Sequence, residues 1–261
     1  MNDALYIAAT GMRASQTQVD TIAHNVANLN TAGFRRNVVS FSEVSASVTP
    51  TGTDPILEAV RANLAARGAG TLASPVLSTA GGELKQTGEN LDIAIDGVGF
   101  FEVTRADGSV AYTRAGSLRL NEEGVLTLAD GTPLSAQLQF PPDTKKIVVN
   151  SDGRVLANVG DDTTPIEIGQ LELVTFANAA GLRPIGGNLF VATPESGEAR
   201  AGVPGEEGRG TLRQGFLESS NVQLVEELVA MMLAQRAFEL NGRVIQAADQ
   251  MMQITNALYK A

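Results

Sequence analysis

The sequence predicts a mixed α and β protein: a mainly β central domain, antiparallel and sandwich- or barrel-like, with a long α-helix at each end. Two observations support this prediction. Apolar residues recur with heptad spacing at both ends of the chain, whereas the central part alternates apolar and polar residues between closely spaced turns. Because both terminal segments carry an apolar stripe, we expect their helices to pair as a coiled coil.

The N-terminal segment has the 3-4 spacing of a coiled-coil seam. The seam is predicted to contain Leu5, Met12, Val19, Ile22, Val26 and Leu29, with Ala8 and Ser15 between them. The pattern stops at residues 30–33, where Gly33 fits a helix C-cap. Because Ala8 and Ser15 bury little area, we expect this helix to be marginal alone and to fold when it is packed. Two amphipathic surface helices of a globular domain are the alternative interpretation of the terminal patterns.

The C-terminal segment carries the longer apolar pattern. Its seam is predicted to contain Leu224, Met231, Phe238, Ile245, Met252 and Tyr259, which recur every seven residues. Neighbouring rows are also apolar, so that the stripe covers an arc of roughly 160°. A helix of this length would reach about 55 Å at ~1.5 Å per residue, and therefore needs a long partner. Residues 219–221 (Ser, Ser, Asn) can supply its N-cap.

Residues 34–82 connect the first helix to the β domain. Val38 to Val44 alternates apolar and polar residues as a short strand does. Pro50 to Asp54 is typical of a turn, Pro55 to Arg67 of a short helix, and Gly68 to Gly82 of a loop. The predicted domains are therefore a discontinuous helical domain (1–33 and 222–261), a connecting segment (34–82) and a β domain (83–221).

The β domain begins where the apolar period changes to two. Leu91 to Ile95 alternates, and Asp107-Gly108 predicts a tight hairpin turn between arms at 101–105 and 110–114. Further turn sequences follow at short intervals, which is typical of an all-β sandwich or barrel.

The composition excludes several classes of function. The net charge of −10 argues against a nucleic-acid partner, because no basic stripe is available to meet phosphates. The absence of cysteine excludes disulfides, thiolate metal sites and cysteine nucleophiles, and a single histidine, His24, cannot form a histidine cluster. No apolar run reaches the ~18 residues of a membrane span, and Met1-Asn2-Asp3 lacks the basic start of a signal peptide.

Motifs for catalysis or cofactor binding are incomplete. Residues 97–100 (GVGF) lack the third glycine and the helix of a dinucleotide site. Asp92 and Asp96 share a strand face and could form a carboxylate pair, but the turn at Asp96-Gly97 explains the second residue equally well. The acidic turn at 121–124 lacks the ligand register of a calcium loop. We therefore predict no enzymatic activity, no catalytic residue, no cofactor, no metal and no small-molecule substrate.

Three motifs resemble those of the bacterial flagellar rod and hook proteins, a family of axial proteins. Residues 23–35 (AHNVANLNTAGFR) are similar to the family signature that ends the first helix. Residues 91–101 (LDIAIDGVGFF) and 111–116 (AYTRAG) resemble its central element, and residues 214–222 (QGFLESSNV) with 226–229 (EELV) resemble its C-terminal signature. The resemblance assigns the family motif to Asn25, Ala27, Asn28, Thr31, Gly33, Phe34, Gly97, Gly99, Phe100, Gly215, Ser220, Asn221, Glu226 and Glu227.

This resemblance implies a structural subunit of the basal body that polymerises helically into the distal rod, the drive shaft that transmits motor torque to the hook. It implies as partners further copies of the chain, proximal rod proteins, the hook protein, and the peptidoglycan- and outer-membrane-ring proteins. Export by the flagellar type III apparatus, without a cleaved signal peptide, would bring the chain to the rod in the periplasm. A proximal-rod protein of the same family is the alternative, and a secreted β-rich binding module is a more distant one. Residues 45–80 match the family poorly.

Overall fold

The computed structural model describes residues 2–43, 71–160 and 165–260, which form two compact units. Unit 1 comprises Met1–Ala27, Asn37–Val76 and Gln223–Ala261 within these limits, and unit 2 comprises Asn28–Arg36 and Leu77–Val222. The turn predicted at 50–54 and the helix predicted at 55–67 lie outside the described residues.

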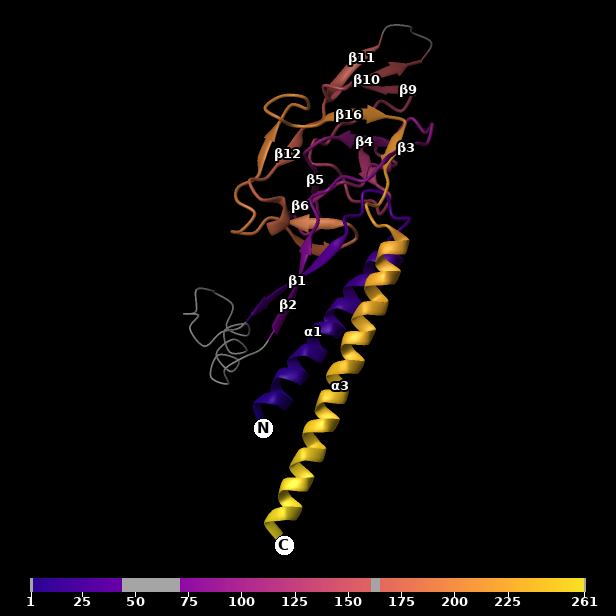
Figure 1. The fold of residues 1–261 in the computed structure, drawn as a ribbon. Coiled ribbons are helices and arrows are strands. Elements are labelled where there is room, and N and C mark those ends of the chain that lie inside the picture. The colour runs from indigo at the N-terminus through magenta and orange to yellow at the C-terminus, as the bar shows by residue number, and fades with distance from the viewer. Residues whose placement is uncertain (1, 44–70, 161–164, 261) are drawn as a thin grey trace. The chain divides into compact units, whose positions relative to one another are not determined.

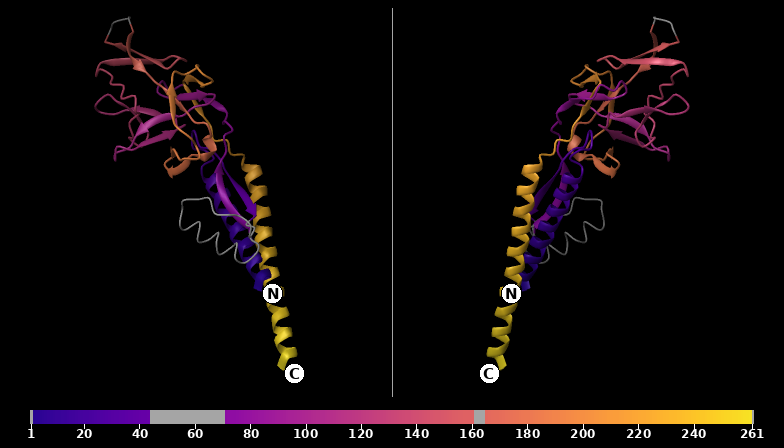
Figure 2. Two further views of the ribbon diagram at one scale, coloured as in Figure 1. Left: turned by 90° about the vertical axis from the view of Figure 1, so that its left-hand side faces the viewer. Right: turned by 90° about the vertical axis from the view of Figure 1, so that its right-hand side faces the viewer.

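Unit 1 is built around two long helices, α1 (Asn2–Ala27) and α3 (Leu224–Lys260). They lie side by side and run in opposite directions (Figures 1 and 2). Gly11 lies against Asn241 and Asn25 against Glu227, so the contact point moves back along α3 as α1 advances. Because α3 has 37 residues and α1 has 26, the C-terminal part of α3 extends beyond the N-terminal end of α1.

A two-stranded sheet of β1 (Asn37–Glu43) and β2 (Thr71–Leu77) completes the description of unit 1. Strand β1 agrees with the strand predicted at Val38 to Val44. The loop predicted over Gly68 to Gly82 is wrong for residues 71–77. This segment does not alternate and contains Pro75, so its strand conformation depends on pairing with β1, and proline is tolerated because the strand lies at a sheet edge.

The helix α1 ends earlier than its apolar pattern predicts. It stops at Ala27, so that Leu29 follows the helix. Gly33 has a φ of +69° and lies in a turn in which the Phe34 N–H donates to the Thr31 carbonyl oxygen at 3.2 Å. The glycine therefore provides the left-handed conformation expected of a cap, but in the turn after the helix.

The helix α3 begins at Leu224, and the predicted N-cap at residues 219–221 is wrong. The side chain of Asn221 instead accepts a hydrogen bond from the Arg36 N–H at 2.7 Å and donates to the Ala80 carbonyl oxygen at 2.9 Å. Two long-range bonds within unit 2 thus occupy a side chain that local reasoning assigns to the helix.

Unit 2 is mainly β, and each of its described strand pairs runs antiparallel. Its four-stranded sheet has the order β13-β14-β6-β5 (Arg183–Gly186, Leu189–Val191, Val110–Thr113 and Phe101–Thr104). Strands β5 and β6 are joined by the predicted turn, where Gly108 has a φ of +78°. This hairpin prediction is confirmed.

Smaller sheets complete unit 2. A three-stranded sheet has the order β11-β10-β9 (Ile166–Gln170, Arg154–Val159 and Thr144–Val149). The two-stranded sheets are β12 (Leu173–Thr175) with β15 (Arg200–Gly202), β16 (Thr211–Gln214) with β4 (Ile93–Asp96), β17 (Phe216–Glu218) with β3 (Leu84–Gln86), and β7 (Leu118–Leu120) with β8 (Leu126–Leu128). A short 3-10 helix, η1, spans Ala179–Gly181.

A buried apolar core stabilises unit 2. Its centre includes Ile93, Phe101, Val103, Val155 and Leu173, each at most 1 % exposed. Phe101 and Val103 alternate along β5 with half-buried polar residues, as the period of two predicts. The predicted fold class is confirmed: a mainly β, antiparallel domain and two paired terminal helices.

Candidate assembly site

The most deeply buried positions of α3 in unit 1 belong to one heptad row. Glu227, Ala234 and Ala248 are buried in this row, and Asn241 at its remaining position lies against Gly11 of α1. A Cβ atom on Gly11 would lie 2.9 Å from the Asn241 Nδ2 atom, so the two helices approach closely at this point.

The facing row of α1 also contains small residues, with Ile22 as its large member. Ala8, Ser15 and Ile22 form a buried row with the same heptad spacing. Small residues allow two helix backbones to approach, but they remove little apolar surface from water. The most deeply buried positions of the helix pair are therefore mostly small residues, and the larger apolar residues beside them are mainly half-buried or exposed.

The predicted seam residues of α3 lie beside this buried row. Leu224 and Phe238 are 42 % and 41 % exposed, and Met231, Ile245 and Met252 are half-buried. The side chain of Tyr259 lies outside the described residues.

The predicted seam residues of α1 are better covered. Ile22 is buried, and the others with described side chains are half-buried: Leu5, Met12, Val19, Val26 and, beyond the helix, Leu29. The role of the two predicted rows as an assembly seam stays a prediction.

Large apolar side chains remain exposed along α3 in the single chain. Each of the following is at least 41 % exposed: Leu224, Val225, Leu228, Val229, Met232, Leu233, Phe238, Leu240, Val244, Met251 and Ile254. Isolated exposed apolar residues are normal on a monomer, but a continuous set of this size marks an interaction surface.

A buried polar network lies in unit 1 where α1 ends and α3 begins. The Asn25 side chain accepts from the Asn37 N–H at 2.9 Å and donates to the Asn37 carbonyl oxygen at 2.8 Å. Its Nδ2 atom also lies 3.3 Å from Oε2 of Glu227, and Asn25 and Glu227 are each 1 % exposed. One amide side chain thus fixes the start of β1, the end of α1 and the start of α3 within unit 1.

A buried ion-pair cluster in unit 2 joins segments that are distant in the sequence. Glu218 accepts at Oε1 from Nη2 of Arg35 at 2.9 Å and at Oε2 from Nε of Arg114 at 2.8 Å. The three side chains are at most 5 % exposed. Arg114 Nη1 also donates to the carbonyl oxygens of Gly97 at 2.9 Å and Gly99 at 2.7 Å. These bonds compensate the cost of burying the charges.

The charge balance of the ion-pair cluster is uneven, with two guanidinium groups and one carboxylate. Burial is the main cause that lowers the pKa of Arg35 to about 10; repulsion by Arg114 lowers it further, and Glu218 opposes the shift. Arg35 also donates through Nη1 to the Ala80 carbonyl oxygen. Glu218 therefore provides the negative charge that both guanidinium groups of the cluster contact inside unit 2.

Gly33 ties the turn at residues 28–36 to this ion-pair cluster. Its N–H donates to the Glu218 carbonyl oxygen at 2.7 Å. A Cβ atom at Gly33 would lie 2.5 Å from the Arg114 carbonyl oxygen, and the residue has a positive φ. Only glycine fits this position without a shift of the backbone.

The central motif places an aromatic ring beside the same cluster. Phe100 is 5 % exposed and meets the rings of Phe176 and Phe190 edge-on, with centroids 6.0 and 6.1 Å apart. The Arg114 guanidinium carbon lies 5.9 Å from the centroid of the Phe100 ring. A Cβ atom on Gly97 would lie 2.7 Å from the Gly210 Cα atom, and one on Gly99, directly before the phenylalanine, would lie 3.2 Å from the Leu173 Cβ atom. Gly99 also has a φ of +145°, which explains the glycine at that position.

The other motif residues lie in turns or at element ends. Thr31 and Asn28 form a side-chain hydrogen bond of 3.1 Å in the turn before Phe34, which is buried. Gly215, with a φ of +78°, separates β16 from β17, and Ser220 accepts from the Val222 N–H at 3.4 Å. Ala27 and Glu226 are exposed.

Each of the three family motifs contributes one charged side chain to the ion-pair cluster. Arg35 ends the first motif, Arg114 belongs to the central motif and Glu218 to the C-terminal one. The sequence-based site residues omitted these three, because a charged residue within a motif does not show which distant residue it meets.

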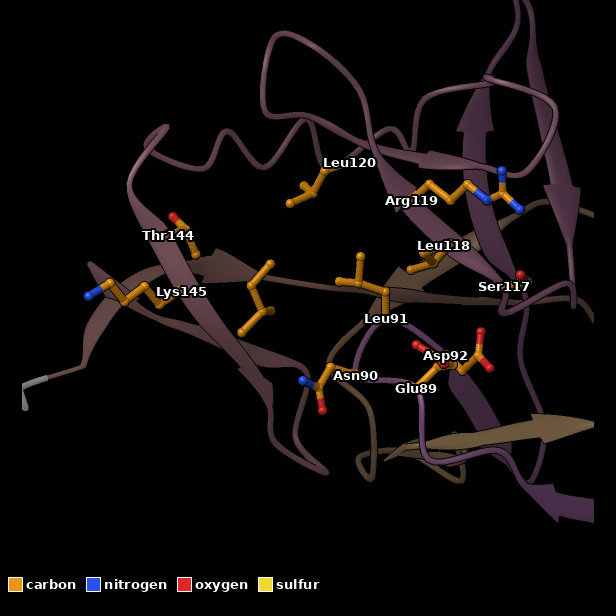
Figure 3. Close-up of a pocket in the computed structure, with 11 residues that line it drawn as sticks. Glu89, Asn90, Leu91, Asp92, Ser117, Leu118, Arg119, Leu120, Thr144 and Lys145 are labelled. Atoms are coloured by element: carbon orange, nitrogen blue, oxygen red, sulfur yellow. The ribbon is translucent and has the colours of Figure 1, made fainter. Parts of the chain in front are cut away.

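A groove on unit 2 has a mixed lining (Figure 3). Residues 89–92, 117–120, 144, 145 and 147 line it, those after residue 92 coming from β7 with its flank and from β9. Leu91, Leu118 and Ile147 provide the apolar part of the lining, here termed the floor, and the acidic residues Glu89 and Asp92 also belong to the lining. Figure 3 shows Glu89 and Asp92 on the same side of Leu91.

The described part of the chain contains neither a candidate membrane span nor a candidate metal site. None of its helices is both long and apolar enough to cross a membrane. Nor do its His, Cys, Asp and Glu residues include a group of three or more that could hold a metal ion.

Three protein-family models match successive parts of the chain. "Flagella basal body rod protein" matches residues 5–35, "Flagellar hook protein FlgE/F/G D1 domain" matches residues 94–157, and "Flagellar basal body rod FlgEFG protein C-terminal" matches residues 213–258.

Curated relatives match nearly the whole chain. The flagellar basal-body rod protein FlgG of Agrobacterium fabrum is 39 % identical over 259 residues, which cover 97 % of this chain and 98 % of the relative. FlgG of Borreliella burgdorferi is 39 % identical over 262 residues and 99 % of both chains. The rod protein FlgF of Mesorhizobium japonicum is 33 % identical over 245 residues, 92 % of this chain and 90 % of the relative.

Proposed function

Since this chain belongs to the flagellar basal-body rod protein family, we propose that it is a structural subunit whose copies polymerise helically into the distal rod, as the FlgG type of the family. In this role the chain has no catalytic part. It transmits motor torque to the hook through contacts between copies.

The exposed apolar surface of α3 is the observation that carries this proposal. The buried residues of α3 are two alanines and a glutamate, whereas most of its larger apolar residues are exposed in one chain. Val225, at 74 % exposed, and Leu233, at 64 %, are examples. A surface of this kind needs a partner, and further copies of the same helix pair can cover it along a polymer.

The symmetry of the polymer determines which type of contact the copies make. A patch that binds a different patch on the next copy generates a helical filament unless the rotation closes a ring. The long α3 offers rows of different composition around its circumference, so one row can serve the chain itself and others its neighbours.

The location and partners follow from the same proposal. The rod lies in the basal body and spans the periplasm, where the chain meets proximal rod proteins at one end and the hook protein at the other. The peptidoglycan- and outer-membrane-ring proteins surround it, and the flagellar type III apparatus exports it without cleavage.

The proximal-rod (FlgF) type is the alternative within the family. The match to an FlgF protein supports it, but at 33 % identity and 92 % of the chain, against 39 % and 97–99 % for two FlgG proteins. A secreted β-rich binding module is disfavoured, because it gives no function to the exposed apolar rows of α3.

Deleting the protein from its bacterium tests the proposal. We expect isolated basal bodies to lack the distal rod and the hook, and the wild-type chain to restore both. An epitope inserted at the exposed Asp107-Gly108 turn locates the chain, because a Cβ atom at Gly108 meets nothing within 4 Å. Antibody labelling along the distal rod supports the FlgG type, and labelling confined to its base supports the FlgF type. Complete, motile flagella in the deletion strain would refute both.

A further inference from the structure

We propose that the groove between β7 and β9 receives strand β13 of a second copy of this chain. Arg183 of that copy would meet the Glu89 and Asp92 carboxylates, and Ile185 would lie on the apolar floor. The inference rests on the proposed function, because it assigns one contact between β domains in the rod.

Asp92 is the main reason to expect a cationic group in the groove. Its side chain lines the groove and is 8 % exposed, yet it makes no hydrogen bond or ion pair with any described residue. Its backbone is fixed, because its N–H donates to the Glu89 carbonyl oxygen at 3.2 Å and its carbonyl oxygen accepts from the Gly215 N–H at 2.8 Å. The carboxylate oxygens of Asp92 are not among the fully buried side-chain atoms that lack a partner, so they face the open groove. An incoming cation would therefore meet an anion that no described residue already pairs.

The rest of the groove suits an apolar neighbour of that cation. Leu118 and Ile147 are buried in the floor, Leu91 is half-buried, and Leu120 is 37 % exposed at the rim. The basic side chains in the lining, Arg119 and Lys145, lie at opposite ends and extend away from Leu91 (Figure 3). The middle of the groove is therefore apolar, with negative charge on one side.

Strand β13 has the complementary pattern. It is the outer strand of the sheet β13-β14-β6-β5, and its four residues are exposed. Arg183 forms no ion pair with the described part of the chain, and Ile185 is 37 % exposed. The pairing of β13 with β14 shifts register between Pro184 and Gly186, so regular alternation does not hold Arg183 and Ile185 to one face. Both side chains are exposed, and their Cα atoms lie within about 7 Å of each other along the chain, so they are close enough to meet one neighbouring surface. Pro184 lacks an N–H, which favours docking through side chains over strand addition.

No other described strand or turn of unit 2 offers this combination. Five large apolar residues of unit 2 are exposed by more than a third: Val98, Val110, Leu120, Ile166 and Ile185. Of these, only Ile185 has a described lysine or arginine two positions away. Because the groove and β13 are different patches of one chain, their contact is head-to-tail and is compatible with a helical polymer.

Cross-linking tests the contact directly, because the chain contains no cysteine. Ser117→Cys in the groove is combined with Ile185→Cys in β13, and assembled rods are treated with a short bismaleimide. We expect covalent multimers in rods and none in dilute protein. Ser117→Cys with Ile166→Cys is the matched control, since Ile166 is 54 % exposed on β11, and we expect it to give no multimers.

Charge exchange provides a second test that does not depend on the cysteines. Glu89→Arg and Arg183→Glu should each reduce the number of complete rods per cell, and the double variant should restore most of the loss. Either of two results would overturn this inference and leave the proposed function standing. One is that rods form normally in both single charge variants, and the other is that rods of the double cysteine variant give no multimers. If the wild-type chain builds no rod, the proposed function fails, and this inference fails with it.

Discussion

At the scale of single residues, Gly33 holds a backbone conformation that brings the turn at 28–36 onto the ion-pair cluster. Gly33→Ala should lower the free energy of unfolding of unit 2 by about 3 kcal/mol, because it adds left-handed strain and a Cβ atom 2.5 Å from the Arg114 carbonyl oxygen. Urea unfolding followed by circular dichroism measures the loss.

Gly88 is the matched control for this substitution. Its φ of +77° is similar, but a Cβ atom there would meet nothing within 4 Å. Gly88→Ala should therefore cost only the conformational strain, about 1 kcal/mol. Equal losses in the two variants would show that the contact with Arg114 has no energetic effect.

Glu218 should be the most sensitive member of the ion-pair cluster. Glu218→Gln leaves two buried guanidinium groups without a compensating charge, and should cost about 4 kcal/mol. Arg35→Met leaves the Arg114–Glu218 pair balanced, and should cost about 2 kcal/mol, because the charge it removes already has a lowered pKa. Thermal unfolding of the two variants gives the order, and a greater loss for Arg35→Met would contradict this charge balance.

At the scale of elements, Asn25 positions two helices and a strand of unit 1. Asn25→Ala leaves both backbone groups of Asn37 and one oxygen of Glu227 without this partner, and should cost about 3 kcal/mol of helix-pair stability. The helical circular dichroism signal during heating measures the effect. Asn30→Ala, at an exposed turn position, should be nearly neutral, and a neutral Asn25→Ala would exclude the proposed positioning role.

The elements themselves were largely predictable, because long heptad runs and a hairpin dipeptide are local signals. Strand β2 was not predictable, because its conformation depends on pairing with β1 rather than on alternation. Strand β1 ends at Glu43, far from the start of β2 at Thr71. The helix ends were also missed, because Asn221 and Gly33 satisfy groups that are distant in the sequence.

The candidate site was predictable in kind but not in detail. The sequence shows that α3 has more apolar rows than one partner helix can cover, but not which row the chain uses itself. Because the two helices approach closely at Gly11, the row of small residues on α3 faces α1. The large residues of the predicted heptad row are therefore only partly covered. The ion-pair cluster needs three segments to converge, which no local pattern encodes.

At the scale of the whole molecule, assembly should depend on the half-exposed heptad row of α3. Phe238 is 41 % exposed in one chain, so a change there should leave the chain folded and act on contacts between copies. Phe238→Asp puts a charge into that row, where burial on assembly would be costly. We expect this variant to be folded by circular dichroism, to form no rods and to leave cells non-motile.

The control for Phe238→Asp must separate charge in the apolar row from the low helix propensity of aspartate. Gln246→Asp introduces the same residue at an exposed polar position of α3, and should assemble normally. Phe238→Leu keeps the row apolar, and should also assemble. If purified rods contain the Phe238→Asp chain as abundantly as the Gln246→Asp chain, the contact between copies must use another face of α3. The exposed residues on the far side of α3, including Leu233 and Leu240, would then be the next row to test.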